Sequence, residues 1–330
     1  MKIAFFSTKS YDREYFDRFN ANSQHRITYF EVSLNTNTAN LAKGFEAVCV
    51  FVNDKLDKET LQKISENGIR AIALRCTGYN NVDIEAAAEK HIKILRVPAY
   101  SPQAVAEHAV ALILTLNRKT HKAFNRIREN NFSIEHLTGF NLYGKTVGVI
   151  GTGLIGSSFC AIMKGFGCNV IAYDVKESDK LKEKGIEYKS LDDILISSDI
   201  ISLHCPLTPD TYHLIDKNSI SKMKKGVMLI NTSRGGLINT QDAIDALKSE
   251  KLGYLGIDVY EQESGLFFKD LSESVVHDEL IGRLMTFFNV LITGHQGFFT
   301  KEALEQIATT TLNNLSDFQN NVELVNEVKI

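Results

Sequence analysis

The sequence lacks a strong excess of one charge and any long apolar run. Its 37 Lys and Arg residues nearly balance 40 Asp and Glu residues, giving a formal net charge of −3, so the composition indicates no affinity for nucleic acid. The most apolar stretch, Ala104–Leu116, contains Glu107 and His108 and is shorter than the roughly 18–20 apolar residues that a membrane span needs. We therefore expect a globular protein that crosses no membrane.

Cysteine pairs of the metal-binding type are also missing. The five cysteines are an odd number, and none of them forms a CxxC pair or takes the His/Cys spacing of a zinc site. The N-terminal segment has no apolar run of about 7–15 residues before a small-residue cleavage site, as a secretion signal would require. We therefore expect reduced thiols, a cytoplasmic location and no bound metal.

What the sequence does contain is a regular alternation of short β-branched runs and amphipathic stretches. This alternation is typical of βαβ units, and 330 residues suggest about two domains. In the first hundred residues we expect helices such as Lys58–Glu66 and Ile84–Lys90 between strands. These strands are predicted near Lys2–Ser7, Arg26–Glu31, Ala47–Val52, Ala71–Arg75 and Ile92–Val97.

A second series of six predicted strands follows. A largely buried helix over Pro102–Arg118 precedes this series, and another helix over Lys301–Leu315 comes after it. Six strands make a complete sheet of the dinucleotide-binding type. The strands are predicted at Lys145–Ile150, Asn169–Asp174, Ile200–His204, Val227–Asn231, Gly256–Val259 and Val290–Thr293.

The two flanking helices predict how the domains are connected. The first is typical of a connector, and the last is expected to return to the first domain, so the chain crosses the boundary twice. We predict an α/β fold of two Rossmann-like or flavodoxin-like parallel-sheet domains, the second inserted into the first. The predicted domains are 1–100 plus 299–330, and 101–298.

A glycine-rich turn follows the first strand of the second series. The segment Val147–Gly156 is VGVIGTGLIG, in which a strand leads into Gly151-x-Gly153-x-x-Gly156 and then a helix. Gly151 would allow a tight turn, Gly153 would let the backbone approach a pyrophosphate, and Gly156 would let the helix pack on the strand. Free N–H groups at the helix start would bind the phosphates. Alternatively, the glycines serve only strand–helix packing.

An acidic residue at the end of the next strand favours NAD. Asp174 lies 18 residues after Gly156, where its carboxylate would accept hydrogen bonds from the adenosine ribose and repel a 2′-phosphate. No arginine lies between Asp174 and Arg234, although Lys176 would partly compensate. The sequence therefore predicts NAD rather than NADP.

Polar residues follow three strands of the second series. Arg234 comes just after Val227–Asn231, where a guanidinium can bind the carboxylate and carbonyl of a small keto acid. Asp258 and Glu263 follow the next strand, and His295 follows the last. The structural alternatives are a cap or interface arginine, a solvated loop glutamate and a core histidine.

An arginine, a carboxylate and a histidine at one sheet edge suit the reduction of a keto acid. While hydride goes to the carbonyl carbon, a proton must reach the oxygen, and His295 would donate it. Glu263 would fix the tautomer of His295 and favour its charged form. Arg234 would orient the substrate and polarise its carbonyl. The residues thus predict an NAD-dependent oxidoreductase.

These residues belong to ordered motifs that resemble the D-isomer-specific 2-hydroxyacid dehydrogenase family over the whole chain. The resemblance implies that the split domain is the substrate (catalytic) domain and that the inserted Rossmann domain binds NAD. It implies fermentative, reversible reduction of pyruvate to D-lactate, with Arg234, Glu263 and His295 as catalytic residues. Besides the glycine turn, the motifs are FVND (Phe51–Asp54), IALRCTGYNNVD (Ile72–Asp83), RVPAYSPQAVAEHA (Arg96–Ala109), ISLHCPLTP (Ile201–Pro209), NTSRGGLI (Asn231–Ile238), DVYEQE (Asp258–Glu263) and TGHQGFFT (Thr293–Thr300).

The same resemblance implies further substrate and cofactor contacts. It places the substrate carboxylate on the backbone amides of Thr77 and Gly78, with Tyr100 and Phe298 around the methyl group. We interpret Cys205, one of the implied cofactor contacts, as a packing residue because no base accompanies its thiol. The implied cofactor contacts beyond the glycines are Leu154 and Ile155 at the pyrophosphate, Asp174 at the ribose, Cys205, Pro206 and Thr211 along the adenine side, and Thr232, Ser233, Arg234 and Asp258 near the nicotinamide.

Two features leave the preferred substrate open. After Glu263 the chain continues into a long acidic and aromatic segment similar to that of the lactate-type subgroup, and Phe298 stands where some lactate enzymes have tyrosine. The alternatives to pyruvate are phenylpyruvate, hydroxypyruvate and glyoxylate. An NAD-sensing binding protein is the alternative outside enzymes, and the complete catalytic set argues against it. The expected protein partner is a second copy of the chain, in a homodimer or homotetramer.

Overall fold

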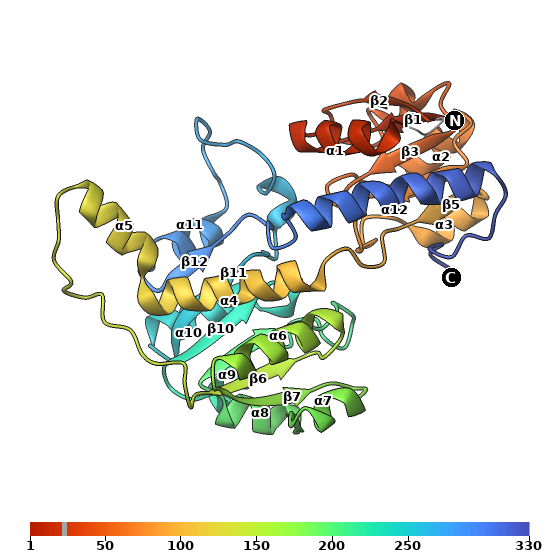
Figure 1. The fold of residues 1–330 in the computed structure, drawn as a ribbon. Helices are drawn as coiled ribbons and strands as arrows, with labels where there is room; N and C mark the ends of the chain where they lie inside the picture. The colour runs from red at the N-terminus through yellow and green to blue at the C-terminus, as the bar shows by residue number, and fades with distance from the viewer. Residues whose placement is uncertain (22–24, 330) are drawn as a thin grey trace. The chain divides into compact units, whose positions relative to one another are not determined.

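The computed structural model describes residues 1–21 and 25–329 and contains two compact units (Figure 1). Unit 1 consists of Met1–Ser101 and Phe299–Ile330, and unit 2 is the single stretch Pro102–Phe298. Each unit is built around one parallel β-sheet with helices on it. The predicted fold class, two parallel-sheet α/β domains, is therefore confirmed.

Unit 1 contains a five-stranded sheet with the order β2-β1-β3-β4-β5. Its strands are β1 (Lys2–Phe5), β2 (Arg26–Tyr29), β3 (Ala47–Val50), β4 (Ala71–Leu74) and β5 (Lys93–Leu95). Its helices are α1 (Ser10–Asn20), the 3-10 helix η1 (Ala39–Ala42), α2 (Lys58–Glu66), α3 (Ile84–Glu89) and α12 (Lys301–Gln319). Helix α12, from the end of the chain, packs against α1 and β4.

The central strands of unit 1 explain why helices are needed on both faces. Every residue of β3 (AVCV) and β4 (AIAL) is buried, as expected for parallel strands that are covered on both sides. The helix starts are set by side chains: Asp57 accepts a hydrogen bond from the N–H of Thr60 at the start of α2, and Thr300 accepts one from Ala303 at the start of α12. The buried strands determine the positions of the loops that follow β4 and β5.

Unit 2 contains a seven-stranded sheet with the order β12-β11-β10-β9-β6-β7-β8, parallel throughout. Its strands are β6 (Thr146–Ile150), β7 (Asn169–Tyr173), β8 (Glu187–Tyr188), β9 (Ile200–Leu203), β10 (Val227–Asn231), β11 (Leu252–Ile257) and β12 (Val290–Ile292). The prediction of six strands was wrong by one, because β8 is only two residues long and pairs with β7 alone at the sheet edge. The first strand, β6, lies between β7 and β9, so the strand order reverses at this point.

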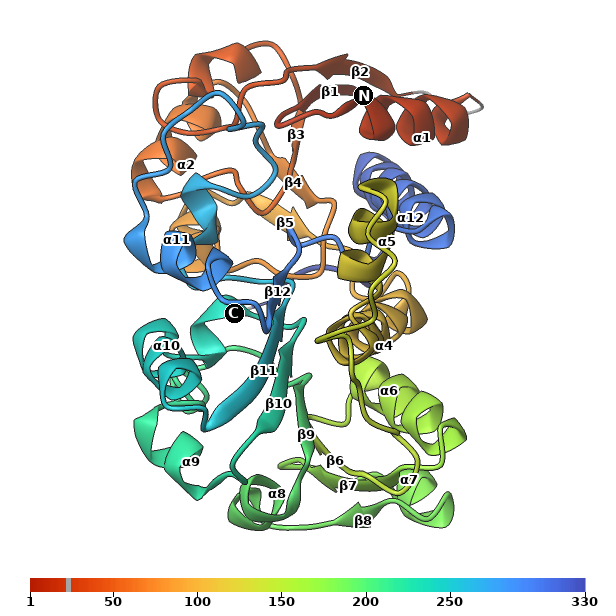
Figure 2. The same cartoon turned by 90° about the vertical axis from the view of Figure 1, so that its left-hand side faces the viewer.

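Helices cover both faces of this sheet (Figure 2). On one face, α4 packs against α6 and against β10 and β11; on the other, α8 contacts β6 and α10 contacts β11. Helix α4 has the predicted bounds Pro102–Arg118, and its buried residues join the core beneath α6. The remaining helices are α5 (Thr120–Arg128), α6 (Leu154–Gly165), α7 (Asp179–Glu183), α8 (Leu191–Ser197), α9 (Lys217–Lys222), the 3-10 helices η2 (Gly235–Leu237) and η3 (Glu263–Gly265), α10 (Thr240–Lys248) and α11 (Glu279–Met285).

Three general features concern the described part of the chain. Among residues 1–21 and 25–329, no helix combines the length and the apolarity that spanning a membrane requires. The same residues contain no group of three or more His, Cys, Asp or Glu side chains placed to bind a metal ion. All five cysteines are buried and free of disulfides.

Candidate active site

The glycine turn lies between β6 and α6, where the strand order reverses. Gly151 has a φ of +94°, and a Cβ atom there would lie 2.5 Å from the backbone nitrogen of Cys205. At Gly156 a Cβ atom would lie 2.0 Å from the carbonyl oxygen of Gly151, whereas the space beside Gly153 is open. The first N–H groups of α6, at Leu154 and Ile155, have no partner within the helix. The turn therefore combines an open approach with hydrogen-bond donors, which suits the phosphates of a dinucleotide.

Asp174, just after β7, points toward this turn. Its Oδ2 accepts hydrogen bonds from the backbone N–H of Thr152 at 2.5 Å and from the Thr152 hydroxyl at 3.0 Å. Burial alone would raise the pKa of Asp174, but these bonds and one from the N–H of Lys176 outweigh burial and lower the pKa. The carboxylate is charged at neutral pH beside the turn, which suits ribose hydroxyls and opposes a 2′-phosphate.

The loop after β9 adjoins the same turn through Cys205. Burial raises the pKa of the Cys205 thiol to about 11, so the thiol is protonated at neutral pH. The Cys205 carbonyl accepts a hydrogen bond from the Ser233 hydroxyl at 2.7 Å, and the Pro206 carbonyl accepts one from the Thr211 hydroxyl, also at 2.7 Å. The first bond connects the loops after β9 and β10, where adenine-side and nicotinamide-side residues are predicted, and the second stays within the loop after β9.

Arg234 lies in the turn after β10. The side chain of Asn231 fixes this turn, because its amide donates to the Arg234 carbonyl and its oxygen accepts from the N–H of Ser233. The guanidinium donates to the Ser233 carbonyl at 2.6 Å. At Gly235 a Cβ atom would lie 2.1 Å from the carbonyl carbon of Tyr260, so the Arg234 turn packs directly on the loop that follows β11.

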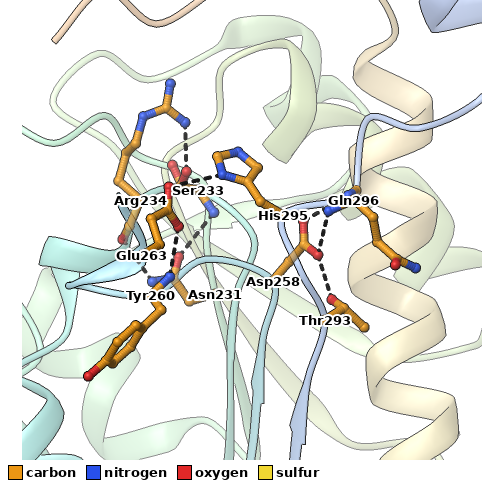
Figure 3. Close-up of polar contacts among 10 residues, drawn as sticks. Asn231, Ser233, Arg234, Asp258, Tyr260, Glu263, Thr293, His295 and Gln296 are labelled. Carbon is orange, nitrogen blue, oxygen red and sulfur yellow. Dashed lines mark hydrogen bonds and ion pairs between the residues drawn. The ribbon is translucent and has the colours of Figure 1, made fainter. Parts of the chain in front are cut away.

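His295 and Glu263 form a hydrogen-bonded pair beside Arg234 (Figure 3). The distance between His295 Nδ1 and Glu263 Oε1 is 3.0 Å, and Glu263 Oε2 accepts a hydrogen bond from the N–H of Tyr260. The ring of Phe268, from the long segment after Glu263, lies 5.7 Å from the imidazole of His295. Since Nδ1 faces the carboxylate, Nε2 is the ring nitrogen directed away from Glu263.

Asp258 is almost completely buried, with 1% of its surface exposed. Its Oδ1 accepts hydrogen bonds from the Thr293 hydroxyl at 2.5 Å and the N–H of Gln296 at 2.9 Å, and its Oδ2 accepts one from the N–H of Gly297 at 2.7 Å. His108 Nε2, on α4, lies 3.3 Å from Oδ1. The structure thus places Asp258 against the turn that carries His295.

The predicted substrate residues are divided between the units. Thr77 and Gly78 follow β4 in unit 1, where the Thr77 carbonyl accepts a hydrogen bond from Arg96 at 3.1 Å. Tyr100 also belongs to unit 1, near its boundary with α4, whereas Phe298 is the buried last residue of unit 2. The structure brings Arg234, Glu263 and His295 together within unit 2.

Sequence reasoning missed two histidines that contact site loops. The sequence predicts His108 only as part of the connector helix, and it predicts no role for His213. His213 Nε2 lies 2.6 Å from Glu261 Oε1, and the other Glu261 oxygen accepts a hydrogen bond from the Thr240 hydroxyl. Burial alone would raise the pKa of Glu261, but the bonds from His213 and Thr240 lower it. No spacing in the sequence signals these contacts, because each joins segments far apart in the chain.

Comparisons with known proteins show similarity over the whole chain. The family model described as D-isomer specific 2-hydroxyacid dehydrogenase, NAD binding domain, matches residues 110–297. A 2-hydroxyacid dehydrogenase homolog of Haemophilus influenzae is 53% identical over 315 residues, covering 96% of this chain and 95% of that protein. The D-lactate dehydrogenase of Escherichia coli is 50% identical over 328 residues, covering 99% of this chain and 100% of that protein. The apo-structure of D-lactate dehydrogenase from Escherichia coli matches with a TM-score of 0.92 at 48% identity, covering 100% of each chain.

The glycine turn leads to a test of dinucleotide binding. In a Gly151→Ala variant the new Cβ atom would overlap the backbone of Cys205, and the positive φ would add strain of about 1–2 kcal/mol. We expect the Kd for NADH, measured by fluorescence titration, to rise at least about tenfold. Gly165→Ala is the matched control, because a Cβ atom at the end of α6 meets nothing within 4 Å. An unchanged Kd in Gly151→Ala would contradict this assignment of the turn.

Proposed function

The chain belongs to the D-isomer-specific 2-hydroxyacid dehydrogenase family, a family of NAD-binding oxidoreductases, and from this premise we propose that it reversibly reduces pyruvate to D-lactate. The observation that carries the proposal is the hydrogen-bonded pair of Glu263 and His295 beside Arg234, at the carboxyl ends of three neighbouring strands. The names of the Escherichia coli relative and of its apo-structure, D-lactate dehydrogenase, support lactate as the product.

The proposed mechanism assigns one task to each of the three residues. NADH, when bound, supplies the hydride that the carbonyl carbon of the substrate accepts. His295 donates a proton from Nε2 to the carbonyl oxygen, because its Nδ1 is engaged by Glu263. Glu263 stabilises the charged imidazolium before transfer. Arg234 binds the substrate carboxylate and polarises the carbonyl with paired N–H donors. In lactate oxidation the same nitrogen of His295 accepts the proton.

For the cofactor, we propose the contacts along the carboxyl edge of the unit 2 sheet. The amides of Leu154 and Ile155 would bind the pyrophosphate at the glycine turn, and Asp174 would bind the ribose. Among the described residues, Asp258 Oδ2 accepts one hydrogen bond, from the N–H of Gly297, and it has the capacity to accept another. This oxygen would accept a hydrogen bond from the carboxamide of the nicotinamide. The other proposed contacts are Cys205, Pro206 and Thr211 toward the adenine and Thr232, Ser233 and Arg234 toward the nicotinamide.

For the substrate, we propose that unit 1 is the substrate domain and unit 2 the NAD-binding domain. The backbone amides of Thr77 and Gly78 would bind the substrate carboxylate. Tyr100 and Phe298 would contact the substrate methyl group. The support for these four residues is the family to which the chain belongs.

A larger substrate is the second candidate, and one observation favours it. The phenyl ring of Phe268 lies 5.7 Å from His295, so an aromatic group is available next to the proposed proton donor. Together with Phe298 in place of a tyrosine, this ring would favour an apolar 2-keto acid such as phenylpyruvate. The reaction at Arg234, Glu263 and His295 would be the same.

We also propose that the enzyme assembles as a homodimer or homotetramer. Helix α5 of unit 2 has no buried residue, and it exposes 61% of Phe124 and 54% of Ile127. Phe132 and Ile134, in the segment that follows, are also exposed. Large apolar side chains exposed on neighbouring segments of the chain support a contact with another chain.

The proposed compartment is the cytoplasm. Its support is the set of five cysteines, all of them free of disulfides in the structure. Reducing compartments keep thiols in this form.

The proposed reaction is tested by NADH oxidation at about 340 nm with pyruvate, phenylpyruvate and hydroxypyruvate in parallel, followed by chiral analysis of the products. We expect pyruvate to have the highest kcat/KM and D-lactate to be the product. A higher kcat/KM for phenylpyruvate would support the second candidate. Absence of turnover with every small 2-keto acid would refute both.

The role of His295 is tested by His295→Gln. The glutamine retains polarity and size but cannot donate an acidic proton, so we expect kcat to fall about 10²–10⁴-fold while the Kd for NADH stays nearly unchanged. His277→Gln, at an exposed histidine of unit 2, is the control and should retain the wild-type kcat. A variant of His295 with normal turnover would exclude this residue as the proton donor.

The role of Glu263 is tested through the pH profile. Reduction requires a protonated His295, and a carboxylate 3.0 Å from Nδ1 favours that form. In Glu263→Gln the negative charge is lost. As the pH rises, this variant should therefore lose reduction activity at a lower pH than the wild type does. The control is Glu279→Gln, an exposed glutamate at the start of α11. The pairing would be rejected if the kcat profiles of Glu263→Gln and the wild type coincided.

A further inference from the structure

We propose that His108, on helix α4, is a positioning residue for His295, acting through hydrogen bonds with Thr293 and Asp258. The inference rests on the proposed function, since it concerns the placement of the proposed proton donor. Four contacts carry it: His108 Nε2 to Thr293 Oγ1 at 3.0 Å, His108 Nε2 to Asp258 Oδ1 at 3.3 Å, and the bonds from the N–H groups of Gln296 and Gly297 to the Asp258 carboxylate.

The backbone of His295 needs support from its surroundings. Its φ is +56°, a left-handed conformation that is unfavourable for residues other than glycine. The N–H of His295 donates to the Asp258 carbonyl at 2.7 Å, and the N–H of Gln296 donates to the Asp258 carboxylate (Figure 3). The N–H of Gly297 donates to the same carboxylate. Successive N–H groups in such a turn form a concave site for an anion. Asp258 is that anion, so its charge stabilises the strained turn.

The Asp258 carboxylate in turn depends on the groups around it. A buried carboxylate is unfavourable unless hydrogen-bond donors or a positive charge compensate it. Burial alone would raise the pKa of Asp258, but hydrogen bonds from His108 and Thr293 outweigh burial and lower it. Among the described residues that donate to this carboxylate, His108 is the one with a basic side chain.

The direction of the hydrogen bonds shows what His108 contributes. The Thr293 hydroxyl has one hydrogen, which it donates to Asp258 Oδ1. The hydroxyl oxygen must therefore accept from His108, so His108 Nε2 carries a hydrogen. His108 thus donates to Thr293 and Thr293 donates to Asp258, whose carboxylate also accepts the N–H groups of the turn of His295.

Helix α4 gives His108 a fixed position. The helix packs against β10, β11 and α6. Val105 and Leu112, which lie one turn before and one turn after His108 on the same face of the helix, are core residues. A Cβ atom at Gly297 would lie 3.4 Å from His108 Cδ2, so the imidazole packs closely on the backbone that follows His295. An apolar residue at position 108 would remove this donor, and a smaller one would also remove the packing contact.

The expected consequence is a loss of kcat rather than of cofactor binding. If the turn relaxes, His295 loses its alignment with Glu263 and with the substrate oxygen, and misplacement of about 1 Å can cost about 10²-fold in rate. The glycine turn and Asp174 lie at other strands and keep their geometry. The imidazolium of His295 would also be less well stabilised by Glu263.

The experiment compares His108→Leu with His108→Gln. Glutamine retains an N–H donor at about the position of Nε2, whereas leucine has none. We expect kcat of His108→Leu to fall about 10–100-fold, while the Kd for NADH stays within about threefold of wild type. As the pH rises, reduction by this variant should lose activity at a lower pH than reduction by the wild type. His108→Gln should recover kcat to within about threefold and restore the wild-type pH profile. The control is His121→Leu, on α5, whose Nδ1 has no hydrogen-bond partner among the described residues.

A second variant keeps the test decisive if His108→Leu does not fold. Thr293→Val removes the bridging hydroxyl with little change in size, and it should reproduce the lower kcat and the displaced pH profile. The inference is overturned if His108→Leu or Thr293→Val has wild-type kcat and pH profile, or if His108→Gln is as impaired as His108→Leu. His295→Gln is measured in parallel. If this variant retains the wild-type kcat, the proposed function of His295 is refuted. If only the variants at positions 108 and 293 behave like the wild type, the positioning role alone is refuted.

Discussion

Parallel strand direction is the constraint on which the site depends. Because β10, β11 and β12 run the same way and lie side by side, the loops after them end at one edge of the sheet. Arg234, Glu263 and His295 come from these three loops, although they are far apart in the sequence. The close packing of Gly235 on the Tyr260 carbonyl brings the first two loops together, and the hydrogen bond from the N–H of His295 to the Asp258 carbonyl brings in the third. Backbone geometry thus brings the side chains of Arg234, Glu263 and His295 together.

The short segment from Asp258 to Glu263 contains three carboxylates, and each contacts a different histidine. Asp258 contacts His108 on α4, Glu261 contacts His213 in the loop after β9, and Glu263 contacts His295 in the loop after β12. The segment is therefore fixed from three directions by partly buried pairs, for which loss of one partner is costly. Such support on several sides suits a site in which the reacting groups must keep their positions.

The sequence predicts those parts of this arrangement that depend on local patterns. Buried β-branched runs mark the strands, apolar spacing predicts α4 with its observed bounds, and strand ends identify Arg234, Glu263 and His295 as neighbours. The remaining parts depend on tertiary contacts. Strand β8 is too short to have a pattern of its own, and its pairing with β7 defines it. The contacts of His108 with Asp258 require the left-handed turn at His295 and the packing of α4. No residue spacing in the sequence predicts either feature.

The insertion of unit 2 as one continuous stretch has a consequence for synthesis on the ribosome. All five strands of unit 1 are made before unit 2, but α12, which packs on α1 and β4, is made after it. Unit 2 can complete its core as soon as Phe298 has emerged, because all of its strands and helices are by then available. Until α12 emerges, unit 1 lacks the helix that covers part of its buried sheet, and its apolar surface there is exposed to aggregation or to chaperones. The unit that begins first is thus the last to finish folding.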